Sequence, residues 1–89
     1  LRQQVTSLLY KINDLLDKPN ERAAGNLKAL VQGLENDLQT GKNVYAIDDR
    51  IKRIINSLNG EARDAQIMDP AHIAMLRHSF EQLRNRIHG

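Results

Sequence analysis

The stretch VYAIDDRIKRIINSL, residues 44–58, contains the pattern that decides the fold of this chain. Its apolar residues recur at intervals of three and four positions, which places them on one side of a helix. They are Val44, Ile47, Ile51, Ile54 and Leu58. A helix with one apolar stripe must cover that stripe against another element. The stretch therefore predicts an amphipathic helix that packs against a hydrophobic core.

Three other segments repeat this spacing, within residues 1–15, 23–38 and 73–87. Together with start and stop signals, the four stripes predict helices over about residues 2–17, 20–40, 44–59 and 70–88. Stripes of similar length can cover one another, and short connections make successive helices neighbours. The sequence predicts an all-α, up-and-down antiparallel four-helix bundle, with residues 1–89 forming one domain.

Residues between the stripes support these boundaries. Pro19 stops the first helix, because proline disfavours helical backbone at the preceding residue. Gly41 suits the left-handed position after the second helix, and Asn43 is a candidate cap for the third. Asp69-Pro70 is a strong helix start, with aspartate as the cap and proline at the first helical position. The connections are therefore expected to be short.

Two local features carry further expectations about packing. Residues 61–68 predict a short helical turn or an ordered loop that covers one end of the core. Gly25 and Gly33 lie inside a predicted helix, where each costs about 1 kcal/mol relative to alanine. We therefore expect them to allow a neighbouring helix to approach closely.

Composition limits the classes of function. The 89 residues include 27% charged and 3% aromatic residues, a net charge of +2 and no cysteine. Disulfides, thiolate metal sites and thiol nucleophiles are excluded. No apolar run approaches the roughly 20 residues that span a bilayer, so no membrane partner is expected. The lack of a visible signal peptide and of cysteine favours an intracellular location, and the start at Leu1 suggests a fragment or a chain numbered from its first ordered residue.

The titratable residues do not form a pattern typical of catalysis. His72, His78 and His88 are six and ten positions apart, rather than the three or four that bring helical side chains together. His78 and Ser79 are adjacent, which is poor geometry for a base and its nucleophile. No glycine-rich phosphate loop is present. The sequence predicts no catalytic residue, no metal, no cofactor and no enzymatic activity.

Most charges are expected to pair within their own helices, as in the series Arg77, Glu81, Arg84. Residues 42–60 are the exception, because they hold four basic and only two acidic residues. Within them Arg50, Arg53 and Ser57 follow one flank of the apolar stripe. This flank is interpreted as a contact strip for an acidic partner segment or for phosphates, or as an ordinary solvated surface. Nucleic-acid binding is the weaker interpretation, because no aromatic residues are interleaved for base stacking.

Additional apolar residues lie beside the stripes. Leu9 and Leu16 widen the first stripe, whereas Tyr10 and Met75 lie off the stripes. Such residues either enlarge the core or, where exposed, form a patch beside a groove for an amphipathic partner helix.

The pattern of aliphatic residues resembles a known family. The features are a first helix over 5–16, the run Leu27, Leu30-Val31, Leu34, Leu38 before Gly41-Lys42, the run Ile47, Arg50-Ile51, Ile54-Ile55, Leu58, and the terminal Leu76, Phe80, Leu83, Ile87. They are similar to the helical carboxy-terminal domain shared by the steroid receptor RNA activator protein and the large outer-coat subunit of COPII vesicles. The resemblance implies a non-catalytic adaptor domain that joins other proteins.

The leading hypothesis is a non-catalytic protein–protein interaction or assembly module. Its partner is expected to be another protein with a helical or acidic segment, contacted through Arg50, Arg53 and Ser57. The alternative is a small nucleic-acid-associated helical domain, in which the same arginines meet phosphates. A third interpretation is a homo-oligomer that associates through the wide stripe of the first helix.

Overall fold

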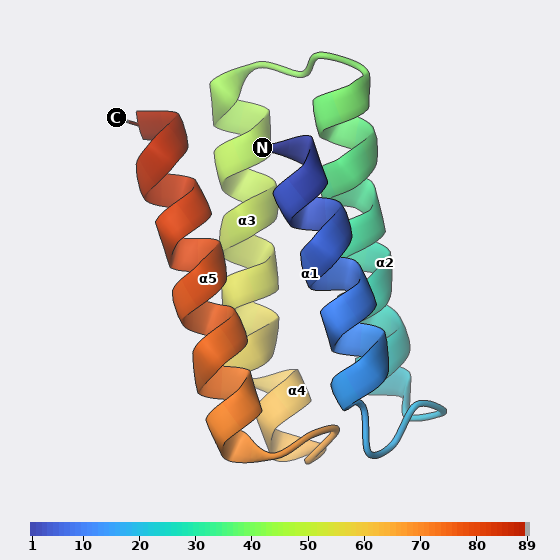
Figure 1. Ribbon diagram of the computed structural model, residues 1–89. Helices are drawn as coiled ribbons and strands as arrows, with labels where there is room; N and C mark the ends of the chain where they lie inside the picture. The colour runs from blue at the N-terminus through green and yellow to red at the C-terminus, as the bar shows by residue number, and fades with distance from the viewer. Residues whose placement is uncertain (89) are drawn as a thin grey trace.

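Four long helices and one short helix make up the computed structural model, which describes residues 1–88. They are α1 (Arg2–Leu15), α2 (Arg22–Gln39), α3 (Val44–Asn59), the short α4 (Glu61–Asp64) and α5 (Pro70–His88). The four long helices alternate in direction, and no strand occurs within the described residues (Figure 1). The predicted all-α antiparallel four-helix bundle is confirmed.

The hydrophobic core draws on every helix, and most of it consists of the predicted stripes. The stripe prediction is wrong for Leu1 and Val44, which lie at helix starts and are exposed. Ile12, Leu27, Ile51 and Phe80 are among its fully buried side chains, one from each long helix. Leu9 and Leu16 are half-buried against this core, whereas Tyr10 and Met75 remain exposed. The aliphatic stripes therefore pack together as the spacing predicts, and the two residues that lie off the stripes face solvent.

The helix caps lie where the sequence places them. Asn43 Oδ1 accepts a hydrogen bond from the Ala46 backbone N–H at 2.9 Å, and Asp69 Oδ1 accepts one from the Ala71 N–H at 2.8 Å. Gly41 adopts a φ of 72°, which is the left-handed conformation that glycine tolerates best. These residues fix the ends of α2, α3 and α5.

The connection between α1 and α2 differs from the prediction. α1 ends at Leu15, two residues early, and α2 begins at Arg22, two residues late. For the end of α1 the reason is tertiary, because the backbone N–H groups of Asp17 and Lys18 donate to the carbonyl of Ile67, at 2.8 and 3.3 Å. These bonds draw the chain away from helical geometry and attach the end of α1 to the loop before α5.

Residues 61–68 form the predicted helical turn and ordered loop. Ala62, Ile67 and Met68 are buried, and they close the core at the end of the bundle where α4 lies (Figure 1). The expectation for the two helical glycines is wrong. Gly25 is exposed, and a Cβ there would meet nothing within 4 Å. Gly33 makes room for the guanidinium of Arg50 and not for a neighbouring backbone.

Packing between the long helices is uneven. α2 packs against α1 and α3, and α3 packs against α5, so helices that follow one another are neighbours as predicted. α1 and α5 contact each other very little, and α3 is visible between them in Figure 1. The bundle is therefore closed on three sides and open along the seam between its first and last helices.

Candidate functional site

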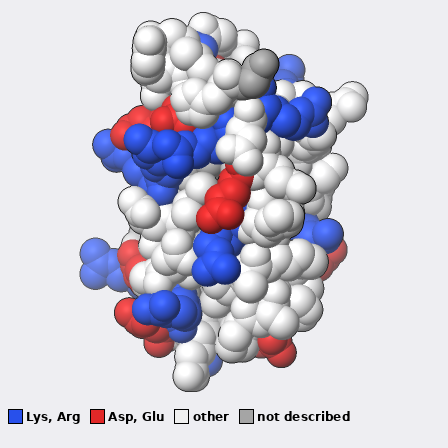
Figure 2. Space-filling view, turned by 90° about the vertical axis from the view of Figure 1, so that its left-hand side faces the viewer, with Lys and Arg blue, Asp and Glu red and all other residues white. Residues whose placement is uncertain are grey.

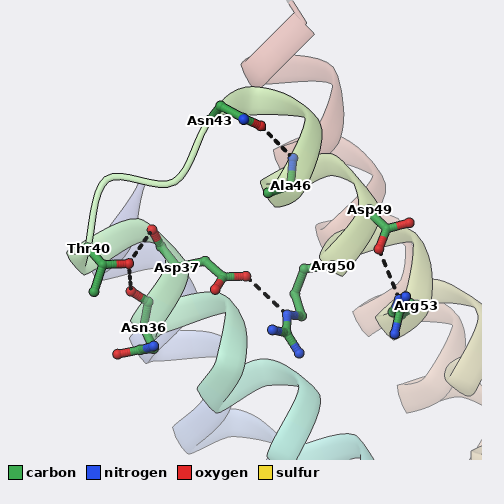
Figure 3. Close-up of polar contacts among 8 residues, drawn as sticks. All are labelled: Asn36, Asp37, Thr40, Asn43, Ala46, Asp49, Arg50 and Arg53. Carbon is green, nitrogen blue, oxygen red and sulfur yellow. Dashed lines mark hydrogen bonds and ion pairs between the residues drawn. The ribbon is translucent and has the colours of Figure 1, made fainter.

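The predicted contact residues Arg50 and Arg53 lie on α3 but engage different carboxylates. Arg50 Nε donates to Asp37 Oδ2 on α2 at 3.1 Å, and Arg53 Nε donates to Asp49 Oδ2 on its own helix at 3.0 Å. Figure 3 shows the two guanidinium groups on different sides of α3. The structure therefore separates the two arginines instead of joining them into one strip.

The third predicted residue, Ser57, is placed differently again. Its Oγ atom is buried and has no hydrogen-bond partner among the described residues. A buried hydroxyl of this kind is not presented to a partner on the surface. The interpretation of Arg50, Arg53 and Ser57 as a contact strip stays a prediction, and their geometry does not bring them together.

The Arg50–Asp37 pair joins α2 to α3. Asp37 is 7% exposed, so its carboxylate requires a partner to offset the cost of burial. Gly33, one turn before Asp37, leaves the space that the Arg50 guanidinium occupies. This arrangement gives both the arginine and the glycine a structural role.

A second carboxylate, Asp48, joins α3 to α5. Its Oδ1 atom lies 2.7 Å from Arg84 Nε and 2.8 Å from His88 Nε2, and Lys52 Nζ lies 3.6 Å from Oδ2. The hydrogen bond from Arg84, and then that from His88, holds the pKa of Asp48 below its ordinary value. The expectation that charges pair mainly within helices is therefore wrong for Arg84, which contacts α3 and not Glu81.

An open groove follows the seam between α1 and α5, with a volume of about 770 Å³. Leu8 and Leu83 are its apolar lining residues, and Leu83 is only 4% exposed. Met75 is 39% exposed and lies one turn before Ser79 on the same face of α5, which places it beyond that end of the groove. The lining residues are Gln3, Gln4, Ser7, Leu8 and Lys11 of α1, and Ser79, Gln82, Leu83, Asn85 and Arg86 of α5.

The charge of the groove is entirely positive. Lys11 and Arg86 are its only charged lining residues, and neither forms an ion pair within residues 1–88. The remaining polar lining residues are amides and hydroxyls, which can both donate and accept hydrogen bonds. The groove therefore combines an apolar floor, neutral polar walls and two cations that have no ion-pair partner among residues 1–88.

The surface on the α5 side of the bundle has a mixed charge (Figure 1 and Figure 2). In the view of Figure 2, lysine and arginine side chains are interspersed with aspartate and glutamate. Binding to a nucleic-acid backbone generally uses a continuous basic surface. The face in Figure 2 does not have one.

Among residues 1–88, no group of three or more histidine, aspartate or glutamate side chains is arranged to hold a metal ion. No helix in the described part of the chain has both the length and the apolar character needed to cross a bilayer. Comparison with protein-family models, curated proteins and solved structures finds no match. The resemblance to the adaptor-domain family therefore stays a prediction.

Reasoning from the sequence did not identify the groove. The periodicity places Leu8 and Leu83 on their stripes, but it does not say how far apart α1 and α5 lie. The sequence contains one sign of the groove, because the residues that flank these two stripes carry hydroxyl or amide groups instead of charges. They are Gln4, Ser7, Ser79 and Gln82. Met75 is a second sign, because it is an apolar residue that lies off the stripe of its helix and is exposed.

Proposed function

We propose that this chain is a non-catalytic protein–protein interaction module that binds its partner in the groove between α1 and α5. One observation carries the proposal: the seam between the first and last helices is left uncovered while the other three seams are packed. A helix laid into an apolar groove between two helices is a recurring mode of protein recognition.

The ion pairs of the two arginines of α3 favour the groove over α3 as the binding surface. Arg50 and Arg53 already have carboxylate partners, so phosphate or acidic ligands would compete with Asp37 and Asp49 for them. Lys11 and Arg86 have no such competitor among the described residues. The groove is thus the better surface for a partner than the predicted strip on α3.

The test is a selection of helix-forming peptides from a displayed library of unbiased charge. Binding of the selected peptides is then measured with two matched variants. Gln82→Trp fills the groove from an exposed wall position, and Gln32→Trp places the same side chain on the exposed surface of α2. We expect Gln82→Trp to abolish binding and Gln32→Trp to leave it unchanged, with both variants melting like the parent protein.

Two results would contradict the proposal. Peptides that bind Gln82→Trp as tightly as the parent protein would place the interaction elsewhere. Binding to RNA or DNA that persists at physiological salt and is lost in the Arg50→Ala/Arg53→Ala variant would favour the nucleic-acid alternative. Such binding would weaken steeply with salt, because it releases counterions from the phosphates.

A further inference from the structure

We infer that the occupant of the α1–α5 groove is an amphipathic helix of two to three turns with acidic residues on its flanks. This inference rests on the proposed function and adds the chemistry of the partner. Its basis is the shape of the groove, the apolar floor and the unpaired cations on its two walls.

The dimensions of the groove suit a short helix. Its lining runs from Gln3 to Lys11 on α1 and from Ser79 to Arg86 on α5. At 1.5 Å of rise per residue, each wall is about 10–12 Å long, which matches about two helical turns. Met75, one turn below Ser79, provides apolar surface for one more turn.

Other peptide conformations fit the groove less well. An extended strand binds by pairing with an exposed sheet edge, and residues 1–88 contain no strand. A polyproline helix binds to aromatic side chains, and none lines the groove. A helix satisfies its own backbone hydrogen bonds, so it needs only an apolar floor such as Leu8 and Leu83, with polar groups along its flanks.

The positions of the cations define where the acidic residues belong. α1 and α5 are antiparallel, so Lys11 lies at the same end of the groove as Ser79, and Arg86 lies at the end of Gln3 (Figure 1). The two cations therefore occupy opposite walls at opposite ends. An occupant with a carboxylate on each flank can pair with both cations. A basic occupant would face two like charges, and the lining contains no acidic side chain to pair with it.

The experiment compares three helical peptides of about 14 residues, so that they form helices in solution. Their central two to three turns share one leucine stripe and carry glutamate, glutamine or lysine on both flanks. Binding is measured by fluorescence anisotropy with the parent protein and with Lys11→Glu/Arg86→Glu. The matched control is Arg22→Glu/Lys42→Glu, which makes the same change in net charge at exposed residues outside the groove.

We expect the parent protein to bind the glutamate peptide about five- to ten-fold more tightly than the glutamine peptide, and the lysine peptide least. Lys11→Glu/Arg86→Glu should reverse this order, and the control variant should retain it. Raising the salt concentration from about 0.05 to about 0.5 M should reduce the preference, because the pairs are exposed to solvent.

Each contrary result has a distinct meaning. Equal binding of the three peptides, or a reversal in the control variant as well, would overturn the inference about acidic flanks while leaving the proposed groove intact. Failure of all three peptides to bind would overturn the groove itself as a helix-binding site. A concentration-dependent dimer in sedimentation that Gln82→Trp abolishes would assign the groove to a second copy of this chain and overturn the inference.

Discussion

Arg84 on α5 donates a hydrogen bond of 2.7 Å to Asp48 on α3, and the two residues are 36 positions apart in the sequence. His88, one turn further along α5, approaches the same carboxylate oxygen. Because Asp48 is largely buried, these contacts hold the last two turns of α5 against α3. They also keep one wall of the groove in place, since Arg86 lies between Arg84 and His88.

The first prediction concerns the pH dependence of stability. The pKa of Asp48 is lowered in the folded protein, so the folded state binds this proton less readily than the unfolded state. The stabilisation is therefore present above the ordinary aspartate pKa of about 4 and is lost as the pH falls through the lower folded pKa. Urea unfolding should show Asp48→Asn destabilised by about 1–2 kcal/mol at pH 7, with the difference shrinking in acid.

Asp49→Asn is the control for this experiment. It removes the same charge from the neighbouring residue, whose ion pair with Arg53 is exposed on both sides. Its effect should be within about 0.5 kcal/mol at neutral pH. A difference between the parent protein and Asp48→Asn that stays constant down to pH 2 would show that the carboxylate does not stabilise the fold in this way.

The second prediction uses two adjacent residues of α5. Leu76 is fully buried and Met75 is 39% exposed. Leu76→Asp should unfold the domain, because it buries an unpaired charge, and Ile51→Asp on α3 should do the same. Met75→Asp should retain the helical circular dichroism spectrum and a cooperative melt. A native-like melt for Leu76→Asp or Ile51→Asp would mean that the core is assigned to the wrong residues.

The third prediction contrasts two glycines. Gly25→Ala should stabilise the protein by about 0.5–1 kcal/mol, because the site is open and alanine favours the helix. Gly41→Ala should destabilise it by about 1 kcal/mol, because the left-handed conformation is costly for a residue with a Cβ. Chemical denaturation of both variants measures these changes. Destabilisation by Gly25→Ala would indicate a neighbour that the structure does not place there.

The fourth prediction concerns Ser57. Its buried hydroxyl has no partner among the described residues, so Ser57→Ala should be neutral or stabilise the fold by up to about 1 kcal/mol. Thermal unfolding measures this effect. A loss of peptide binding in Ser57→Ala, with stability unchanged, would instead restore Ser57 as a contact residue.

Periodicity was sufficient to predict the four long helices, because each stripe is a local property of its own segment. The caps at Asn43 and Asp69 are also local, and they are confirmed. The end of α1 was not predictable from local rules, because the backbone N–H groups of Asp17 and Lys18 bond to the distant carbonyl of Ile67. A contact between distant segments decides that boundary.

The charge pairs and the groove depend on how the helices are placed relative to one another. Asp48 lies four residues after Val44 and beside Ile47, and this position next to the stripe is the available sign of its burial. Its partner Arg84 was not identifiable, because Arg84 is equally well spaced to pair with Glu81. The separation of α1 and α5 is likewise a property of the assembled bundle. It cannot be predicted from the hydrophobic periodicity of either helix.

The Ile67 carbonyl also has a consequence for the order of folding. α1 packs against α2, its neighbour in the chain, and the junction of Asp17 and Lys18 with Ile67 adds a contact that closes a longer loop. Contacts of high sequence separation form late, so this junction is expected to close after the α1–α2 pair has formed and to open first. Since α1 supplies one wall of the groove, a ligand bound there stabilises only fully assembled molecules, by mass action.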